Sequence, residues 1–257
     1  MQQVRAKKHL GQHFLKDPQI GKRIVDSLQG KYKYVLEIGP GMGILSHFLF
    51  EHKEYETFLI DIDQESIHFL RGEFPFRQDR IIEGDFLQFE LQKKFNAPVA
   101  IIGNFPYNIS SQILFKVLDN KDFIPEVVGM FQKEVAERIA SGPGNRDYGI
   151  LSVFMQMYYD VELLFVLDQK DFNPPPKVKS AVLRFTLKPG FVPDCDEKLF
   201  RRVVKVAFNQ RRKTLRNALS AMTDKSTMTD LPFLDLRAER LSWQDFVVLT
   251  NAIAKII

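Results

Sequence analysis

Short apolar runs alternate with amphipathic stretches from Tyr34 to about Val128, and this alternation constrains the fold more than any other feature. The runs are rich in Val, Ile, Leu and Phe, which is typical of buried strands, whereas the stretches between them carry apolar residues at helical spacing. Strands that alternate with helices indicate βαβ units around a parallel sheet. The predicted strands are residues 34–39, 57–62, 79–85, 97–104 and 125–131, and the predicted helices are residues 44–52, 64–74, 110–120 and 133–140.

The rest of the chain divides into a continuation of the sheet and a helical tail. The further predicted elements are a helix at 148–159, strands at 160–167 and 180–187, and amphipathic helices at 198–208 and 242–253. Beyond Lys188 no strand is evident in the sequence. We therefore expect an α/β fold with a doubly wound sheet in residues 1–188 and a small all-helical domain in residues 189–257.

Composition narrows the class of protein. The 257 residues are 45% apolar and 26% charged, which excludes collagen-like, low-complexity and wholly disordered chains. The single cysteine, Cys195, excludes a disulfide framework and a structural Cys cluster, which fits a reducing cytoplasm. The five histidines show no ligand-like clustering, so we expect no metal site. We also expect no membrane span, because no run approaches the roughly 18 uninterrupted apolar residues that a span needs.

Positive charge is concentrated in two segments. The formal net charge is only +4, but residues 1–23 carry six Lys or Arg against one acid, and residues 198–216 carry eight against none. Because these segments contribute +5 and +8, the rest of the chain carries −9. An acidic body with two basic segments favours contact with a polyanion. The alternative is a solvated helix face with acids nearby in space.

A glycine-rich segment, Glu37–Gly43, joins the first predicted strand to the first predicted helix. Glycines there allow a tight turn and let a nucleotide-like ligand approach the helix N-terminus. The segment is not the dinucleotide fingerprint, because that pattern needs a small residue where this chain has Ile44. The spacing E-x-G-x-G-x-G instead looks like the S-adenosylmethionine loop of Rossmann-like methyltransferases. A purely structural turn is the alternative.

Acidic residues follow the second and third predicted strands. Asp61 is placed where a carboxylate accepts both ribose hydroxyls of an adenosyl group; Asp63 competes for that role, and capping of the next helix is the alternative for Asp61. Asp85 is expected to accept a hydrogen bond from an adenine amino group, with Phe86 against the ring. Because the ends of successive parallel strands converge on one crevice, these residues are expected to share a ligand.

The segment Asn104–Tyr107, with the sequence Asn-Phe-Pro-Tyr, ends the fourth predicted strand. An amino nitrogen conjugated to a base ring is a poor nucleophile because its lone pair is delocalised. Hydrogen bonds from that amino group to the Asn104 side-chain oxygen and the carbonyl of Phe105 or Pro106 would favour a pyramidal nitrogen, with its lone pair directed at a methyl donor. Tyr107 would stack on the extruded base. A proline-aromatic turn is the alternative.

With these motifs the chain resembles the bacterial small-subunit ribosomal RNA adenine dimethyltransferase (KsgA) family over nearly its full length. Further matching blocks are residues 8–15, 132–139, 148–153, 172–180 and 208–217. The resemblance implies a Rossmann-like class I methyltransferase sheet that uses S-adenosylmethionine and releases S-adenosylhomocysteine. It also implies dimethylation of two adjacent adenosines in a hairpin loop near the 3′ end of 16S rRNA, within the small ribosomal subunit. We accordingly expect a cytoplasmic monomer that acts on no DNA and no membrane.

The cofactor residues come partly from the resemblance and partly from the motifs. Carried over by position, the family's cofactor contacts fall on His13, Leu15, Gly39, Asp61, Asp85 and Asn104. The motifs add Glu37, Gly41, Gly43 and Phe86. His13 stands where the family usually has Asn, and Asp61 where it usually has Glu. His13 can still donate one hydrogen bond, and a loop histidine that does not touch the ligand is its alternative.

The catalytic and RNA-binding predictions follow in the same way. The predicted catalytic residues are Asn104, Phe105, Pro106, Tyr107 and Phe172. Phe172 would cover the second face of the target base, and a core position between two strands is the alternative. The predicted RNA contacts are Lys7, Lys8, Lys177, Arg201, Arg202, Lys205, Arg211, Arg212, Lys213 and Arg216.

Three other functions compete with this interpretation. The related large-subunit rRNA methyltransferase that confers macrolide resistance shares the chemistry, but the blocks 172–180 and 208–217 favour the small-subunit enzyme. An RNA-binding or ribosome-assembly factor that has lost catalysis is disfavoured by the intact Asn104–Tyr107. A nicotinamide-dependent oxidoreductase is disfavoured by Ile44.

Overall fold

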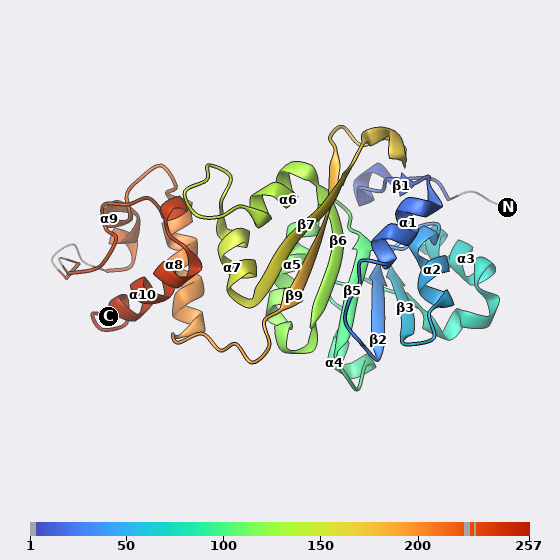
Figure 1. The fold of residues 1–257 in the computed structure, drawn as a ribbon, viewed down its shortest axis with the longest axis horizontal. Helices are drawn as coiled ribbons and strands as arrows, with labels where there is room; N and C mark the ends of the chain where they lie inside the picture. Colours follow the sequence, from blue (N-terminus) through green and yellow to red (C-terminus); the bar gives the residue numbers. More distant parts are fainter. Residues whose placement is uncertain (1–3, 224–226, 229) are drawn as a thin grey trace. The chain divides into compact units, whose positions relative to one another are not determined.

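A seven-stranded sheet in the order β4-β3-β2-β5-β6-β9-β7 forms the centre of the fold in the computed structural model, which describes residues 4–223, 227–228 and 230–257 (Figure 1). Strands β2 to β6 are parallel, and β9 pairs antiparallel with β6. The strands are β2 (Tyr34–Ile38), β3 (Glu56–Asp61), β4 (Ile81–Glu83), β5 (Val99–Asn104), β6 (Glu126–Gln132), β7 (Tyr159–Leu167) and β9 (Ser180–Leu187). Every predicted strand is confirmed, although β4 is shorter than expected.

Helices cover both faces of the sheet. The helices of this part of the chain are α1 (Pro18–Val25), α2 (Ile44–Glu51), α3 (Gln64–Glu73), α4 (Leu91–Lys94), α5 (Ser110–Asp119) and α6 (Lys133–Ala140). Helices α1 and α2 pack on the same side of the central strands, in a core with Val35, Ala100 and Ile102. Right-handed crossovers lead from β2 through β3 to β4 toward one edge of the sheet, and from β5 to β6 toward the other edge. Because right-handed crossovers that run in opposite directions cover opposite faces, α5 lies on the face opposite to α2. The sequence analysis did not predict α1, whose apolar residues are interspersed with charges.

At one position in the sheet, strands that follow each other in sequence are added toward one edge on one side and toward the other edge on the other side. Strand β2 lies between β3 and β5, so the crossovers on its two sides run toward opposite edges. In open parallel sheets the crevice at this switch point, outside the carboxyl ends of the strands, is where ligands bind. The glycine-rich segment after β2 and Asn104 at the end of β5 both lie there.

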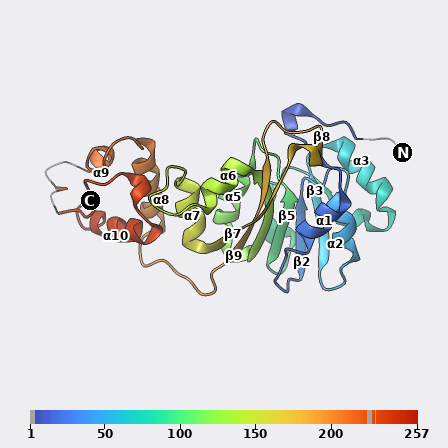
Figure 2. The same ribbon diagram turned by 45° about the horizontal axis from the view of Figure 1, so that its top comes forward.

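A two-stranded antiparallel sheet joins the N-terminal segment to the proline-rich segment. Strand β1 (Phe14–Leu15) pairs with β8 (Phe172–Asn173), with Leu15 opposite Phe172 (Figure 2). Side chains of consecutive strand residues point to opposite sides, and Leu15 and Phe172 are both in the core with α1 and α2. Strands of two residues carry no readable periodicity, and the sequence analysis did not predict them.

The chain divides into two compact units. The first holds the sheet, in residues up to 136 and 161–187; the second holds residues 137–160 and 188–257. In the second unit α7 (Ile150–Tyr158), α8 (Glu197–Asn209) and α10 (Trp243–Ile253) pack together, with α9 (Leu215–Ala218) beside α8. The sequence analysis placed residues 137–160 with the sheet, but the buried face of α7 packs with the C-terminal helices. None of the helices in the described ranges has the length and apolarity to cross a membrane.

Candidate functional site

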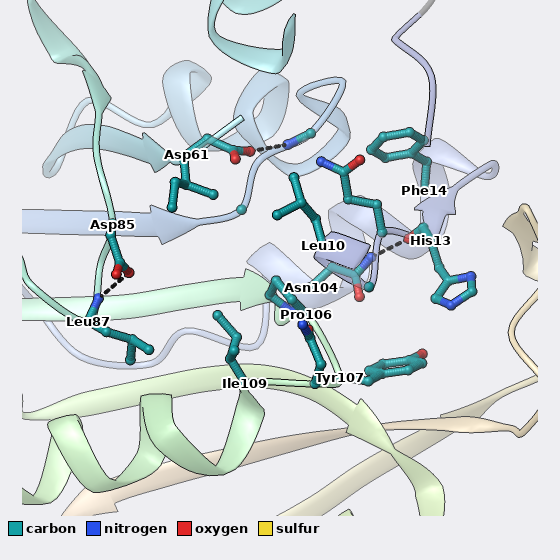
Figure 3. Close-up of a pocket in the computed structure, with 16 residues that line it drawn as sticks. Leu10, His13, Phe14, Asp61, Asp85, Leu87, Asn104, Pro106, Tyr107 and Ile109 are labelled. Carbon is teal, nitrogen blue, oxygen red and sulfur yellow. Dashed lines mark hydrogen bonds between the residues drawn. The ribbon is translucent and has the colours of Figure 1, made fainter. Parts of the chain in front are cut away.

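A pocket opens at the switch point, beyond the carboxyl ends of β2, β3, β4 and β5 (Figure 3). One wall consists of residues at these strand ends, and the opposite wall is the N-terminal segment Leu10–Phe14. The lining residues are Leu10–Phe14, Gly39, Gly41, Asp61, Ile62, Asp85, Leu87, Asn104 and Pro106–Ile109. Six of the predicted cofactor residues therefore meet in one pocket: His13, Gly39, Gly41, Asp61, Asp85 and Asn104.

The glycines of the segment after β2 are required by the shape of the pocket. Gly39 and Gly41 have φ angles of +66° and +56°, which side chains rarely adopt. A Cβ atom on Gly41 would also lie 2.7 Å from the ring of Phe14 in the opposite wall. Gly43 is likewise at positive φ, but it packs against α3 residues and the ring of Phe74, and does not line the pocket.

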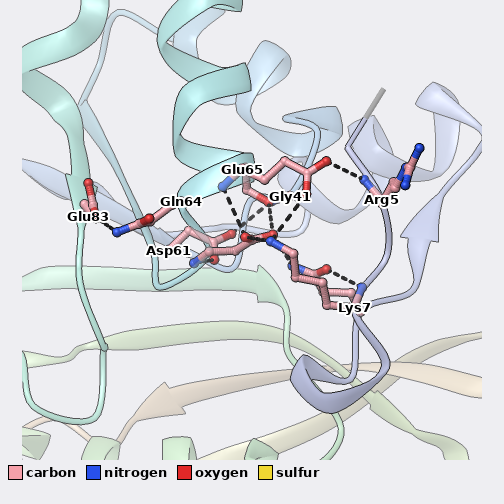
Figure 4. Close-up of polar contacts among 10 residues, drawn as sticks. Arg5, Lys7, Gly41, Asp61, Gln64, Glu65 and Glu83 are labelled. Carbon is pink, nitrogen blue, oxygen red and sulfur yellow. Dashed lines mark hydrogen bonds and ion pairs between the residues drawn. The ribbon is translucent and has the colours of Figure 1, made fainter. Parts of the chain in front are cut away.

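Asp61 and Asp63 have different environments, which decides between the two. Asp61 is 7% exposed, lines the pocket, and accepts the backbone N–H groups of Asp63 at 2.9 Å and Gly41 at 3.4 Å. Burial raises the pKa of Asp61 to about 6. Asp63 instead caps α3 and accepts hydrogen bonds from Lys7, Gln12 and Ser66 (Figure 4). Asp61 is therefore the residue that can meet a ligand.

The segment after β4 places Leu87 in the pocket lining, where Phe86 was expected. Asp85 lines the pocket and its Oδ1 accepts the Leu87 N–H at 2.8 Å (Figure 3). Leu87 also lines the pocket, whereas Phe86 is 4% exposed and does not. The prediction that Phe86 covers an adenine ring is wrong for this arrangement, because Leu87 supplies the apolar surface at that place.

Glu37 and Leu15 are buried next to the pocket and do not line it. Glu37 is 1% exposed, and its Oε2 accepts a hydrogen bond from the Ser46 hydroxyl at 2.5 Å. Burial raises the pKa of Glu37 to about 8. The bond ties β2 to α2 on the two sides of the glycine-rich segment, and thereby fixes the path of that segment. Leu15 is a core residue next to α1 and α2.

Asn104 has its side-chain amide oriented by the opposite wall. Its Nδ2 donates to the backbone carbonyl of His13 at 2.7 Å, which leaves Oδ1 as the hydrogen-bond acceptor of the amide (Figure 3). Pro106 and Tyr107 line the pocket, whereas Phe105 is 1% exposed and packs edge-on against Phe131. Phe105 therefore can offer only its backbone to a ligand.

A second pocket shares part of its lining with the first. The residues common to both are Gly11, Gln12, His13, Tyr107 and Asn108. The remaining lining residues are Ala6, Lys8, Gln132 and Pro174–Lys177. The Tyr107 hydroxyl lies 2.5 Å from Ser180 Oγ, and its ring stacks on His13 with centroids 5.5 Å apart. His13 Nδ1 lies 2.8 Å from the Pro174 carbonyl, which can only accept, so Nδ1 carries the hydrogen.

Phe172, like Phe105, is a predicted catalytic residue whose side chain lies in neither pocket, and its position follows from the pairing of β8 with β1. It is 1% exposed and packs with Leu15 and Ile24 in the core. Its neighbour Asn173 is the exposed residue of β8. The role of Phe172 as a cover for a base is therefore not supported by this arrangement, and the alternative, a core position, fits it.

The predicted RNA contacts fall into two groups. Several are engaged within the protein: Lys7 binds Asp63 and Glu65, Arg216 binds Asp235, and Arg211 donates to the backbone carbonyls of residues 146 and 148. The others that the structure shows exposed are Lys8, Lys177, Arg202, Lys205, Arg212 and Lys213. Arg201 is half-buried on α8. Lys8 and Lys177 line the second pocket.

Sequence reasoning missed most of the N-terminal wall. Leu10, Gln12 and Phe14 line the pocket, but only His13 was singled out in this segment. Gly11 was the residue in the sequence that could have indicated this wall. Its φ is +67°, and its backbone packs closely against Asn108. A glycine two residues before a predicted ligand contact indicates a close approach of the backbone.

Comparisons with known proteins agree with this geometry. A family model described as ribosomal RNA adenine dimethylase matches residues 3–255. Proteins named ribosomal RNA small subunit methyltransferase A from Cytophaga hutchinsonii and Parabacteroides distasonis are 55% and 54% identical, covering 99% and 97% of this chain and 99% and 94% of their own.

Two solved structures share the fold. A dimethyladenosine transferase from Plasmodium falciparum has a TM-score of 0.79 at 24% identity, covering 95% of this chain and 98% of that one. The 23S rRNA methyltransferase ErmE has a TM-score of 0.69 at 22% identity, covering 94% and 99%. The predicted Rossmann-like class I fold is therefore confirmed.

Proposed function

The chain belongs to the ribosomal RNA adenine dimethylase family, and on that premise we propose that it transfers methyl groups from S-adenosylmethionine to the N6 atoms of two adjacent adenosines near the 3′ end of 16S rRNA. The observation that carries the proposal is the orientation of Asn104, whose Oδ1 is left as an acceptor in the first pocket, which adjoins the second pocket at His13 and Tyr107. One pocket then holds the methyl donor and the other holds the base. Relatives at 50–55% identity are named for the small subunit, which favours 16S over 23S rRNA.

The residues of the first pocket fit an adenosyl cofactor. Gly41 leaves no room for a side chain beside Phe14, and the positive φ angles of Gly39 and Gly41 let the backbone approach the ligand closely. Asp61 accepts ribose hydroxyls, and Asp85 accepts the adenine amino group beside the apolar surface of Leu87. When bound, S-adenosylmethionine supplies an electrophilic methyl group on a sulfonium. The product is S-adenosylhomocysteine.

Asn104 and Tyr107 prepare the target nitrogen. The N6 amino group donates to Asn104 Oδ1 and to a backbone carbonyl of Phe105 or Pro106, which draws its lone pair out of conjugation with the ring. That lone pair forms the new bond to the methyl carbon as the bond from this carbon to the sulfonium sulfur breaks, and the nitrogen then loses a proton to solvent water. Tyr107 holds the base by stacking, and its own ring is fixed by Ser180 and His13.

Basic residues hold the RNA backbone. Lys8 and Lys177 lie at the second pocket, where phosphates next to an extruded base would pass. In the second unit, Arg202 and Lys205 are on the exposed face of α8, and the segment after it carries Arg212 and Lys213. Phosphate contacts of this kind position an RNA without reading its sequence. We place the activity in the cytoplasm, with the chain acting as a monomer on the small subunit.

Methylation of isolated ribosomal subunits tests the proposal. Small subunits from cells lacking this protein should accept methyl groups from labelled S-adenosylmethionine, and mass spectrometry should map them to two adjacent adenosines of 16S rRNA as dimethyladenosine. Large subunits from the same cells serve as the control. Label in 23S rRNA, or no label in either rRNA, would contradict the proposal.

A salt titration tests the basic surface of the second unit. Neutralising Arg212 and Lys213 together to Gln removes up to two phosphate contacts, so the slope of log affinity for small subunits against log salt should become shallower by roughly 1 to 2. The control is Arg211→Gln, which removes donors to backbone carbonyls and should lower the melting temperature with less effect on the slope. An unchanged slope in the double variant would rule out this surface.

A further inference from the structure

Lys116 in α5 binds the segment that follows β4 from below the pocket. Its ammonium nitrogen donates to the backbone carbonyls of Leu87 at 3.0 Å and Phe89 at 2.6 Å. The same atom lies 5.3 Å from the centre of the Phe86 ring. Among the described residues, Lys116 is the only donor to these two carbonyls. One side chain therefore contacts three nearby residues of the segment.

The other hydrogen bonds of this segment are mostly local turn contacts: the Gln88 N–H donates to the Asp85 carbonyl at 3.0 Å and the Phe89 N–H to the Phe86 carbonyl at 3.1 Å. The segment runs from a strand of three residues, β4, to a helix of four residues, α4, so regular hydrogen bonding fixes neither side strongly. Yet the segment supplies Asp85 and Leu87 to the pocket, while Phe86 between them is turned away and buried. This alternation depends on the directions of the peptide groups that Lys116 binds.

We propose that Lys116 is a positioning residue for the cofactor: it fixes the segment after β4 so that the Asp85 carboxylate and the Leu87 side chain face the adenine end of the pocket. This inference rests on the proposed function. It accounts for the orientation of Phe86, whose ring lies beside the ammonium group of Lys116, away from the pocket.

The electrostatic environment of Lys116 agrees with such a role. Burial lowers the pKa of its ammonium group, and the negative charges of Asp85 and Glu90 oppose that shift. The positive charge of Lys116, which orients the peptide carbonyls, is thus favoured by the Asp85 carboxylate, which is also the group proposed to bind the ligand. Hydrogen bonds from a charged donor are stronger than those from a neutral one, which suits a single side chain that holds a whole segment.

Cofactor binding by variants of Lys116 tests the proposal. Lys116→Met keeps the length of the side chain and removes its donors. It should weaken S-adenosylhomocysteine binding in calorimetry, and raise the KM for S-adenosylmethionine, by about 3- to 10-fold. The kcat at saturating cofactor should stay within about 2-fold of the wild-type value, because Asn104 and Tyr107 are on another strand end. Lys116→Arg, which can still donate to carbonyls, should recover most of the affinity.

The choice of ligand separates positioning from general stability. The analogue of S-adenosylhomocysteine with a 6-oxo group in place of the amino group presents an acceptor instead of a donor to Asp85 at this position, so the wild type should prefer the adenosyl form. That preference should shrink in Lys116→Met, because Asp85 is no longer held toward the base. A role in folding alone would lower the melting temperature and leave the preference unchanged.

The matched control is Lys93→Met. Lys93 is 76% exposed and pairs with Glu90 at the far end of the same segment, so this change removes an equal charge without touching the bound carbonyls. It should leave affinity and preference unaltered. If the wild type binds neither ligand, the proposed function fails. If it binds, and Lys116→Met shows wild-type affinity and preference, the inference is overturned. Lys116→Leu, which also lacks donors, provides the same comparison if the Met variant does not fold.

Discussion

The two walls of the cofactor pocket are built in different ways. The strand-end wall, formed by Gly39, Gly41, Asp61, Asp85 and Asn104, lies at or directly after paired strands of the sheet, and Lys116 fixes the part that follows β4. The N-terminal wall, Leu10–Phe14, has only a two-residue strand pairing at its end. Polar contacts hold the rest: Gln12 donates to Asp63, the His13 carbonyl accepts from Asn104, and the His9 carbonyl accepts from Asn108.

The difference indicates which wall should determine the affinity for the ligand and which should determine how fast the ligand binds and dissociates. A wall built into a ladder cannot move without breaking the sheet, whereas a wall held by a few side chains opens at a modest cost. We therefore expect substitutions in the strand-end wall to remove catalysis or affinity. Substitutions behind the N-terminal wall should chiefly change how fast the ligand enters and leaves.

The largest effect is expected at Asn104. Replacing it with Ala removes the acceptor that orients the target amino group, so methyl transfer to small subunits should fall by roughly 100-fold or more, with subunit binding retained. Asn96→Ala, before the opposite end of β5, is the matched control and should remain active. Wild-type methylation by Asn104→Ala would refute the catalytic role, and loss of subunit binding would make Asn104 structural.

Asp85→Ala should weaken cofactor binding next most strongly. An unsatisfied adenine amino group costs about 1 to 3 kcal/mol, which calorimetry with S-adenosylhomocysteine resolves. Glu83→Ala is the control, because Glu83 ends β4 but is exposed and accepts a hydrogen bond from the Gln64 amide. Equal affinities for the wild type and Asp85→Ala would remove this residue from the adenine site.

The pH dependence of binding should identify Asp61. Burial raises the pKa of Asp61 to about 6, and ribose hydroxyls require the carboxylate as acceptor. Protonation therefore competes with the ligand, and affinity should fall about tenfold as the pH drops from 7 to 5. Asp61→Asn cannot titrate, so its weaker affinity should lose most of this dependence. A variant with the wild-type pH profile would place the titrating group elsewhere.

The smallest effect is expected behind the N-terminal wall. Burial alone would raise the pKa of Asp63, but hydrogen bonds from Lys7 and Gln12 hold it below its usual range, so these bonds favour the charged, closed arrangement. Replacing both Lys7 and Gln12 with Met should speed dissociation of S-adenosylhomocysteine about 3- to 10-fold in stopped-flow measurements. Lys22→Met, which breaks an exposed pair with Asp26, is the control. A slower or unchanged dissociation rate would mean that the wall does not open.

The strand-end wall could be predicted from the sequence, because each of its residues follows a strand whose apolar run is readable. Gly39, Asp61, Asp85 and Asn104 occupy the ends of parallel strands, which topology alone brings together. The N-terminal wall could not be predicted in detail, since its contacts join residues separated by tens of positions, as Gln12 and Asp63 are. Resemblance supplied His13 there, but no periodicity marks Leu10 or Phe14.

Phe86 and Phe172 show a second limit. Each lies next to a residue that does meet a pocket or solvent, and a shift of one position exchanges the inward and outward sides of an extended chain. The sequence identifies the segment but does not show which of its side chains point inward. That orientation depends on Lys116 for Phe86 and on the β1–β8 pairing for Phe172. Lys7 shows a third limit, because its charge is used by Asp63 and Glu65.

The pairing of β1 with β8 also sets the order in which the pocket can be completed during synthesis. Phe14 lies opposite Asn173, so one wall emerges from the ribosome long before the residues that anchor its end. Translation proceeds from the N-terminus, and contacts between distant parts of a chain form late. The growing chain therefore carries an unfinished cofactor site until the proline-rich segment has emerged. An enzyme that modifies ribosomes thus gains its own ligand site only after residue 173 has left the ribosome that makes it.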